Sequence, residues 1–115
     1  SGSIVCAAEC SDGIPNHGLF QEILTSKNSP EELLKMIEHP SYKQQDQWQV
    51  QIQAQIQKTT DIYLKSDYLS NEDIYKAHLI PIENIESTIK NLKSKYGGNP
   101  SICVLPEGPQ TIPYI

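Results

Sequence analysis

Near its start the chain has a short apolar run that passes directly into a polar loop, and this stretch decides the fold class: Ile4-Val5-Cys6-Ala7-Ala8-Glu9-Cys10-Ser11-Asp12-Gly13-Ile14-Pro15-Asn16-His17-Gly18. A short uninterrupted apolar run is typical of a strand buried on both faces in a parallel sheet. The loop after it holds a thiol, a hydroxyl, a carboxylate, an amide and an imidazole. We therefore expect polar side chains at the carboxyl end of a strand, which is where parallel sheets bind ligands.

Two later segments repeat this pattern, namely Asp61-Ile62-Tyr63-Leu64-Lys65-Ser66-Asp67 and Ser101-Ile102-Cys103-Val104-Leu105, the second running into Pro106-Glu107-Gly108. Helix signals separate the three runs. This alternation predicts a single α/β domain over residues 1–115. We expect a three-layer module with at least three parallel strands flanked by helices, comparable to half of a Rossmann or flavodoxin-like fold.

Two helices have clear start signals, and a third is indicated by the spacing of its apolar residues. Ser29-Pro30-Glu31-Glu32 supplies a cap, a proline at the first helical position and a glutamate, and predicts a helix to about Glu38. Ser70-Asn71-Glu72-Asp73 begins a shorter helix in the same way. Ile85, Ile89, Leu92 and Tyr96 follow helical spacing before Gly97-Gly98. A less clearly signalled helix is expected from His17 or Gly18 to Leu24, with Asn16 as its cap.

Residues 47–57 alternate polar and apolar side chains, which is the pattern of a strand. Trp48, Ile52 and Ile56 are also spaced four residues apart, and glutamine and alanine are good helix formers. Eleven residues is long for a strand, and the crossover to the next parallel strand needs a helix. We predict a helix, with Ser41 and Gln44 as a capping box upstream.

The composition excludes several classes of partner. The net charge is −5, with nine lysines and no arginine, so nucleic acid is not expected as a partner. No apolar run approaches the roughly 20 residues of a membrane span. Three cysteines without a C-x-x-C pair favour a reducing compartment, which makes the cytoplasm the expected location. Cys6 and Cys103 lie in the apolar runs and are expected to behave as small hydrophobic residues.

The loop from Cys10 to Gly18 has three interpretations. It can be a purely structural turn, with Asp12-Gly13 forming the bend and Pro15 stiffening it. It can be a functional rim. It can also present Cys10 as the nucleophile of a small phosphocarrier, in which a helix N-terminus lowers the thiol pKa. Pro15 removes one backbone N–H and the chain has no arginine, and both facts weaken this third interpretation.

A metal site is not predicted, because His17, His39 and His78 are scattered and form no H-x-x-x-H pair. His39 and His78 are each expected to close a helix. Trp48 is the only tryptophan. It is either a core anchor or, with one ring face beside a cleft, a stacking surface for a flat ligand.

Several segments together resemble the carboxyl-terminal part of the nickel-dependent lactate racemase family. They are the loop Glu9-Cys10-Ser11-Asp12-Gly13-Ile14-Pro15-Asn16-His17-Gly18, Asp46-Gln47-Trp48-Gln49, Ser66-Asp67 and Leu105-Pro106-Glu107-Gly108-Pro109-Gln110-Thr111-Ile112-Pro113-Tyr114. The resemblance covers nearly the whole chain with its segments in the right order. No single segment is decisive, but the combination is fairly specific.

The resemblance implies that this chain is the C-terminal domain of a larger two-domain enzyme with an active site between the domains. Such a parent is a lactate racemase-like isomerase that uses a nickel pincer nucleotide and hydride transfer to racemise or epimerise lactate or another small 2-hydroxy acid. The missing N-terminal domain would bind the cofactor, with none expected on this chain alone. Trp48 is the best match to a tryptophan that lines the cleft. No catalytic residue or metal ligand is carried over.

The leading hypothesis is therefore that this domain forms one wall of an interdomain active site. Trp48 lines the cleft, while Ser11, Asp12, Asn16 and His17 shape its rim or the domain interface. The N-terminal catalytic domain and a small 2-hydroxy acid are the expected partners. The alternatives are a non-catalytic structural or oligomerisation module, and a phosphocarrier that uses Cys10.

Overall fold

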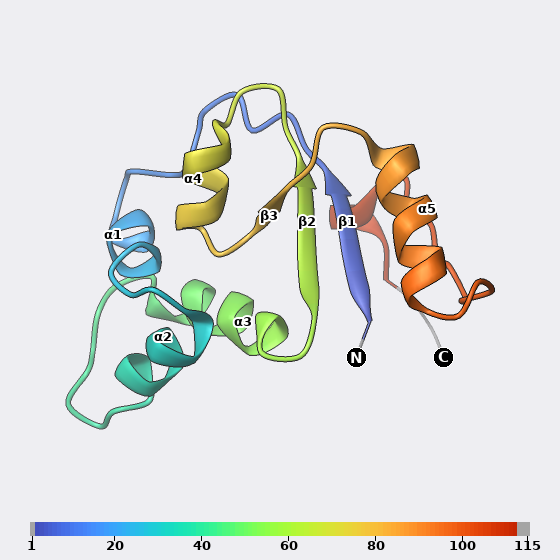
Figure 1. Cartoon of the computed structure of the whole chain (residues 1–115). Helices are drawn as coiled ribbons and strands as arrows, with labels where there is room; N and C mark the ends of the chain where they lie inside the picture. The colour runs from blue at the N-terminus through green and yellow to red at the C-terminus, as the bar shows by residue number, and fades with distance from the viewer. Residues whose placement is uncertain (1, 113–115) are drawn as a thin grey trace.

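A computed structural model describes residues 2–112 (Figure 1). In chain order the elements are β1 (Ser3–Ala7), α1 (Phe20–Leu24), α2 (Pro30–Ile37), α3 (Gln47–Gln57), β2 (Asp61–Lys65), α4 (Asn71–Lys76), β3 (Ile80–Pro81), α5 (Ile85–Lys95) and the 3-10 turn η1 (Gly108–Gln110).

The three strands form one parallel sheet in the order β1-β2-β3. Helices α3 and α4 lie on one side of this sheet and α5 on the other (Figure 1). α5 is held by a hydrogen bond of 2.8 Å between the hydroxyls of Ser3 and Tyr96, and by an ion pair of 2.9 Å between Lys95 and Asp61. The predicted three-layer α/β architecture is confirmed.

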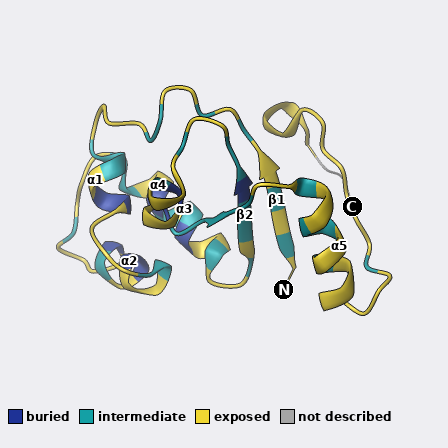
Figure 2. Ribbon diagram, turned by 45° about the horizontal axis from the view of Figure 1, so that its top comes forward, coloured by how far each residue is buried: buried dark blue, intermediate teal, exposed yellow. Residues whose placement is uncertain are grey.

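The core lies between the helices on one side of the sheet rather than around the sheet itself. Leu24, Leu33, Val50 and Ile74 are its largest fully buried side chains, and they come from α1, α2, α3 and α4. α5 contributes no buried residue, and Figure 2 shows that β1 carries no fully buried position. Apolar burial, the main favourable term in folding, is therefore concentrated on the α3 side of the sheet.

The predicted helix starts at Ser29 and Ser70 are confirmed, as is the helix predicted from the spacing of Ile85, Ile89 and Leu92. The Ser29 hydroxyl accepts the Glu32 N–H at 3.2 Å, and the Ser70 hydroxyl accepts the Asp73 N–H at 3.1 Å. Asn84 caps α5 by accepting the Ser87 N–H at 2.8 Å. Each cap satisfies a backbone donor that the first helical turn leaves without a partner. The helical prediction for residues 47–57 is confirmed as well.

Two predicted caps are wrong. α1 begins at Phe20, later than expected, and Leu19 rather than Asn16 precedes it. Ser41 bonds to the His39 ring at 2.7 Å instead of capping α3. In both places the residue with capping chemistry lies too far upstream of the first helical residue.

The third strand was predicted in the wrong segment. Residues 101–105 have no strand pairing, and Ile102, Val104 and Leu105 are exposed. The strand beside β2 is instead Ile80–Pro81, which pairs with Tyr63 and Leu64. Strand β2 thus pairs with β1 on one edge and with β3 on the other. Pro81 has no N–H to donate, and it lies on an edge strand, where proline is tolerated.

The cysteines also differ from expectation. Cys6 lies in β1 as predicted, but both Cys6 and Cys103 are exposed rather than packed as small core residues. All three cysteines are free. Among residues 2–112 no helix is long and apolar enough to cross a bilayer.

Leu33 provides a test of where the core lies. It is 0% exposed at the centre of the helical cluster, whereas Val104 is 76% exposed. Leu33→Ala should lower the free energy of unfolding by about 3 kcal/mol, because it leaves a cavity. Val104→Ala should change it by less than about 0.5 kcal/mol. Chemical denaturation measures both, and equal losses would contradict this placement of the core.

Candidate functional site

The carboxyl ends of β1 and β2 lie side by side, because the strands are parallel and in register from Ser3 and Asp61 to Ala7 and Lys65. The Ser66 hydroxyl joins the loops that follow these strands. It donates to the Glu9 carbonyl oxygen at 2.7 Å and accepts the N–H groups of Tyr68 and Leu69, each at 3.3 Å. This serine therefore fixes the two loops to each other at the edge of the sheet where the sequence placed its polar residues.

The loop after β1 turns sharply at its start. The Gly13 N–H donates to the Cys10 carbonyl oxygen at 2.9 Å, and both residues have positive φ, 54° for Cys10 and 72° for Gly13. Further along, the partly buried Ile14 and Leu19 pack against the helical core. The structural turn at Asp12-Gly13 is therefore present, and apolar anchors hold the rest of the loop.

The four polar residues expected at the site rim do not use their side chains to hold the described part of the chain together. The side chains of Ser11, Asp12, Asn16 and His17 are all exposed. Within residues 2–112 none of them makes a hydrogen bond or an ion pair. Their donors and acceptors are thus available to a ligand or to another domain.

Asp46 connects this loop to α3. Its Oδ2 accepts the Leu19 N–H at 3.1 Å, and its backbone adopts a left-handed conformation with φ of 64°. Gly18 makes the approach possible, because a Cβ at this position would lie 2.2 Å from the same Oδ2 atom. The residue that starts α3 is therefore positioned by the end of the loop.

Trp48 lies in the first turn of α3, two residues after Asp46, and is 59% exposed. The core-anchor interpretation of this tryptophan is wrong. Val50 and Ala54 are the buried residues of α3, and they lie on the opposite face of the helix. The structure thus leaves most of the Trp48 side chain free beside the segment that Asp46 ties to the loop.

The tertiary role of Asp46 was not predicted from the sequence. An aspartate directly before a helix suggests a cap, but the Asp46 side chain makes no cap hydrogen bond. The pairing partner lies 27 residues away. Gly18 gave a weak signal, since glycine is the residue that tolerates both positive φ and close contact.

The described histidines and carboxylates do not form a metal centre. Within residues 2–112 no three His, Cys, Asp or Glu side chains are grouped so that they could hold a metal ion. The His78 Nε2 is 3.0 Å from the Leu24 carbonyl oxygen, so the ring links the ends of α4 and α1. His39 Nδ1 bonds to Ser41. The donor set of the described residues therefore does not form a nickel site by itself.

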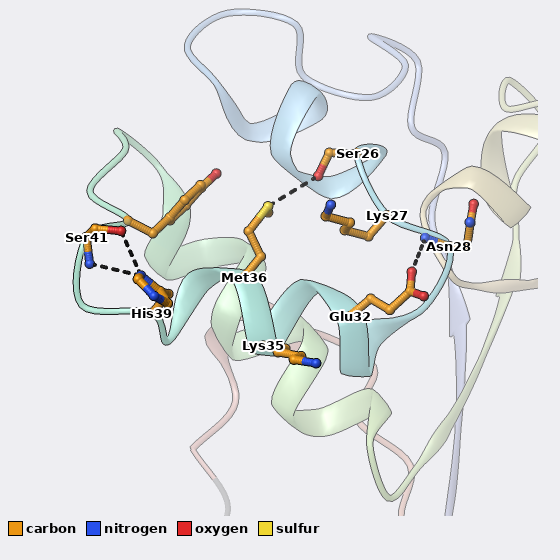
Figure 3. A pocket seen from close by; sticks show the side chains of 9 residues that line it. Ser26, Lys27, Asn28, Glu32, Lys35, Met36, His39 and Ser41 are labelled. Atoms are coloured by element: carbon orange, nitrogen blue, oxygen red, sulfur yellow. Dashed lines mark hydrogen bonds between the residues drawn. The ribbon is translucent and has the colours of Figure 1, made fainter.

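A hollow of about 630 Å³ lies elsewhere, between the α1–α2 connection and the end of α2. Figure 3 shows that neighbouring residues in it bind one another, with the Asn28 N–H donating to Glu32 and His39 bonded to Ser41. Tyr42 also lines it, and burial, followed by the negative charge of Glu22, raises the pKa of its hydroxyl. Neither the loop after β1 nor Trp48 lines this hollow, so it is separate from the candidate site.

Gly18 and Gly13 form a matched pair for testing the Asp46 connection. Both have positive φ, but a Cβ at Gly13 would meet nothing within 4 Å. Gly13→Ala should cost about 1 kcal/mol of unfolding free energy through backbone strain. Gly18→Ala should cost about 1–2 kcal/mol more, because the Asp46 carboxylate must leave the Leu19 N–H. Equal costs in chemical denaturation would show that the close approach is unimportant.

Comparison with known proteins gives the family. A family model described as the lactate racemase C-terminal domain matches residues 1–112. The chain is 26% identical over 112 residues to the lactate racemase of Thermoanaerobacterium thermosaccharolyticum, covering 96% of this chain and 26% of that protein. The structure of the lactate racemase apoprotein from the same organism has a similar fold, with a TM-score of 0.71, 23% identity and coverage of 84% of this chain and 24% of that one.

The chain spans about a quarter of the length of these relatives. The family match extends over nearly the whole chain and includes the loop after β1, Asp46 and Trp48. This chain belongs to the lactate racemase C-terminal domain family.

Proposed function

We propose that this domain forms one wall of an interdomain active site in a racemase or epimerase of small 2-hydroxy acids, with Trp48 lining the cleft. The observation that carries the proposal is the position of Trp48. Trp48 is 59% exposed, although the start of its helix is tied to the strand-end loop through Asp46. A large exposed aromatic side chain on a well-anchored helix is suited to contacting a ligand or another domain.

The openness of the surface supports a site shared between two domains. Ser11, Asp12, Asn16 and His17 have exposed side chains and line neither the hollow beside α2 nor the one between α1 and α4, and residues 2–112 form no metal-binding cluster. A catalytic site for a small acid needs walls on several sides to exclude water. The remaining walls must then come from the part of the parent protein that this chain does not include.

The parent protein is proposed to racemise lactate or another 2-hydroxy acid with the help of a nickel pincer nucleotide. Its N-terminal domain would hold most of this cofactor. When bound, that group supplies a hydride acceptor for the α-carbon. This chain contributes the apolar face of Trp48, which excludes water from the cleft, and a polar rim in which Asp12 and His17 are available to bind or orient groups at its edge. The three free cysteines agree with a cytoplasmic location for the parent.

The phosphocarrier alternative loses its main structural support. Cys10 would need a helix N-terminus to stabilise its thiolate and a bound phosphate. The next helix, α1, begins only at Phe20 and has five residues, and Cys10 lies in the turn closed by Gly13. The structure therefore favours the cleft-wall proposal over a nucleophilic Cys10.

Replacing Trp48 in the full-length, cofactor-loaded protein tests the proposal. Trp48→Ala should lower kcat/KM for lactate racemisation about tenfold or more, the equivalent of about 1.4 kcal/mol, because the cleft loses its apolar wall. Trp48→Phe should retain more activity, since a flat ring remains. Tyr75→Ala is a matched control, because Tyr75 is a similarly exposed aromatic residue on α4 at 63%.

All three variants should unfold at nearly the same denaturant concentration as the parent protein, because both side chains are mostly exposed. Wild-type kcat and KM in Trp48→Ala would refute the cleft role of this residue. An equal loss in Tyr75→Ala would show that the effect is not specific to the proposed wall.

A further inference from the structure

The large apolar side chains of helix α3 point outward and not into the core. Gln53 and Gln57 face the domain, where the Gln53 amide donates to the Ala77 carbonyl oxygen at 2.9 Å and the Gln57 amide donates to that of His78. Trp48, Ile52 and Ile56 face outward and are 59%, 50% and 42% exposed. Their four-residue spacing places them in one stripe along the helix. The large apolar side chains of α3 are thus exposed, while the amides of two of its glutamines hold the helix in place.

The outward face of α3 has no charge. No residue from Gln47 to Gln57 is acidic or basic, and only Gln49 and Gln55 accompany the apolar stripe on the exposed side. Solvent-facing helix surfaces normally carry charged residues. Depletion of charge together with exposed aromatic and aliphatic side chains is instead typical of the buried centre of a protein–protein interface.

The sheet also leaves apolar side chains exposed on the side where α3 lies. Ser3 contacts α5 through Tyr96, and side chains alternate along a strand, so Ile4 and Cys6 point to the opposite face, the side on which α3 lies. Cys6 is paired in register with Leu64 of β2. Leu64 is buried at 6%, whereas Cys6 is exposed and Ile4 is 44% exposed. The helical layer therefore covers β2 on this side and leaves β1 uncovered.

We infer that the surface formed by Trp48, Ile52 and Ile56 of α3 with Ile4 and Cys6 of β1 is the docking face for the N-terminal part of the same polypeptide. The chain spans only about a quarter of its relatives, so a large part of the parent protein is available to cover it. Exposed apolar patches of this kind mark interaction sites rather than free surface. The identity of the partner, the N-terminal part of the protein, is taken from the proposed function. The inference extends the contact with that partner from Trp48 at the cleft to two further turns of α3.

Thiol accessibility in the full-length protein tests this docking face. Ile56→Cys places a probe on the proposed interface, and Asn91→Cys places one at an exposed position of α5 on the other side of the sheet. A maleimide should label the thiol at position 56 about tenfold or more slowly than the thiol at position 91, because it reacts only when the domains separate. Native Cys6 should be protected in the unmodified protein. Peptide mass spectrometry reads each position separately.

Equal labelling rates at positions 56 and 91 would overturn the inference. Protection at position 56 that is lost on dilution to monomeric protein would also overturn the inference. A second copy of the chain, and not the N-terminal part of the same polypeptide, would then cover the face. Protection that persists in the monomer supports docking within one polypeptide. This result is independent of catalysis: unchanged kinetics in Trp48→Ala would refute the cleft role alone, while rapid labelling at position 56 would refute the docking face alone.

Discussion

The arrangement of the candidate site depends on one hydrogen bond, in which the Asp46 carboxylate accepts the Leu19 N–H. It joins the end of the loop after β1 to the residue before α3, and it requires a glycine at position 18 to let the carboxylate approach. Through this contact the strand-end loop and the first turn of α3 take fixed positions relative to each other. The contact adds to the packing of Ile14 and Leu19 against the helical core, which also holds the loop beside α3.

This constraint explains how a small domain can offer a well-defined but incomplete site. The core between α1, α2, α3 and α4 anchors the helix that bears Trp48, and Ser66 fixes the loops at the ends of β1 and β2 to each other. Ser11, Asp12, Asn16 and His17 of the loop after β1 are then left without side-chain partners among the residues that the structure describes. Surfaces that are rigidly supported and chemically unsatisfied are suited to completion by another domain.

Features with local causes could be predicted from the sequence. The starts of α2 and α4 follow from caps at Ser29 and Ser70, whose partners lie three residues away. Helix α5 follows from the spacing of its apolar residues, although its cap at Asn84 was not predicted. β1 and β2 follow from apolar runs, and the helical spacing of Trp48, Ile52 and Ile56 identified α3 correctly. Trp48 was also the residue that sequence reasoning placed in the cleft, and its exposure is compatible with that role.

Features that depend on distant partners could not be predicted. The strand at Ile80–Pro81 has only two residues and exists because β2 offers it an edge, while the more strand-like residues 101–105 find no pairing partner in the described part of the chain. Which face of α3 is buried is decided by its contacts with α1 and α2. The spacing of its apolar residues alone would have directed Trp48 into the core.

The most direct measurement of the central claim is a crystal structure of the full-length protein. It should show the outward face of α3 covered by the N-terminal domain, with the Trp48 ring at the cleft between the domains and much less exposed than the 59% found for this domain alone. A structure in which Trp48, Ile52 and Ile56 still face solvent would contradict the account.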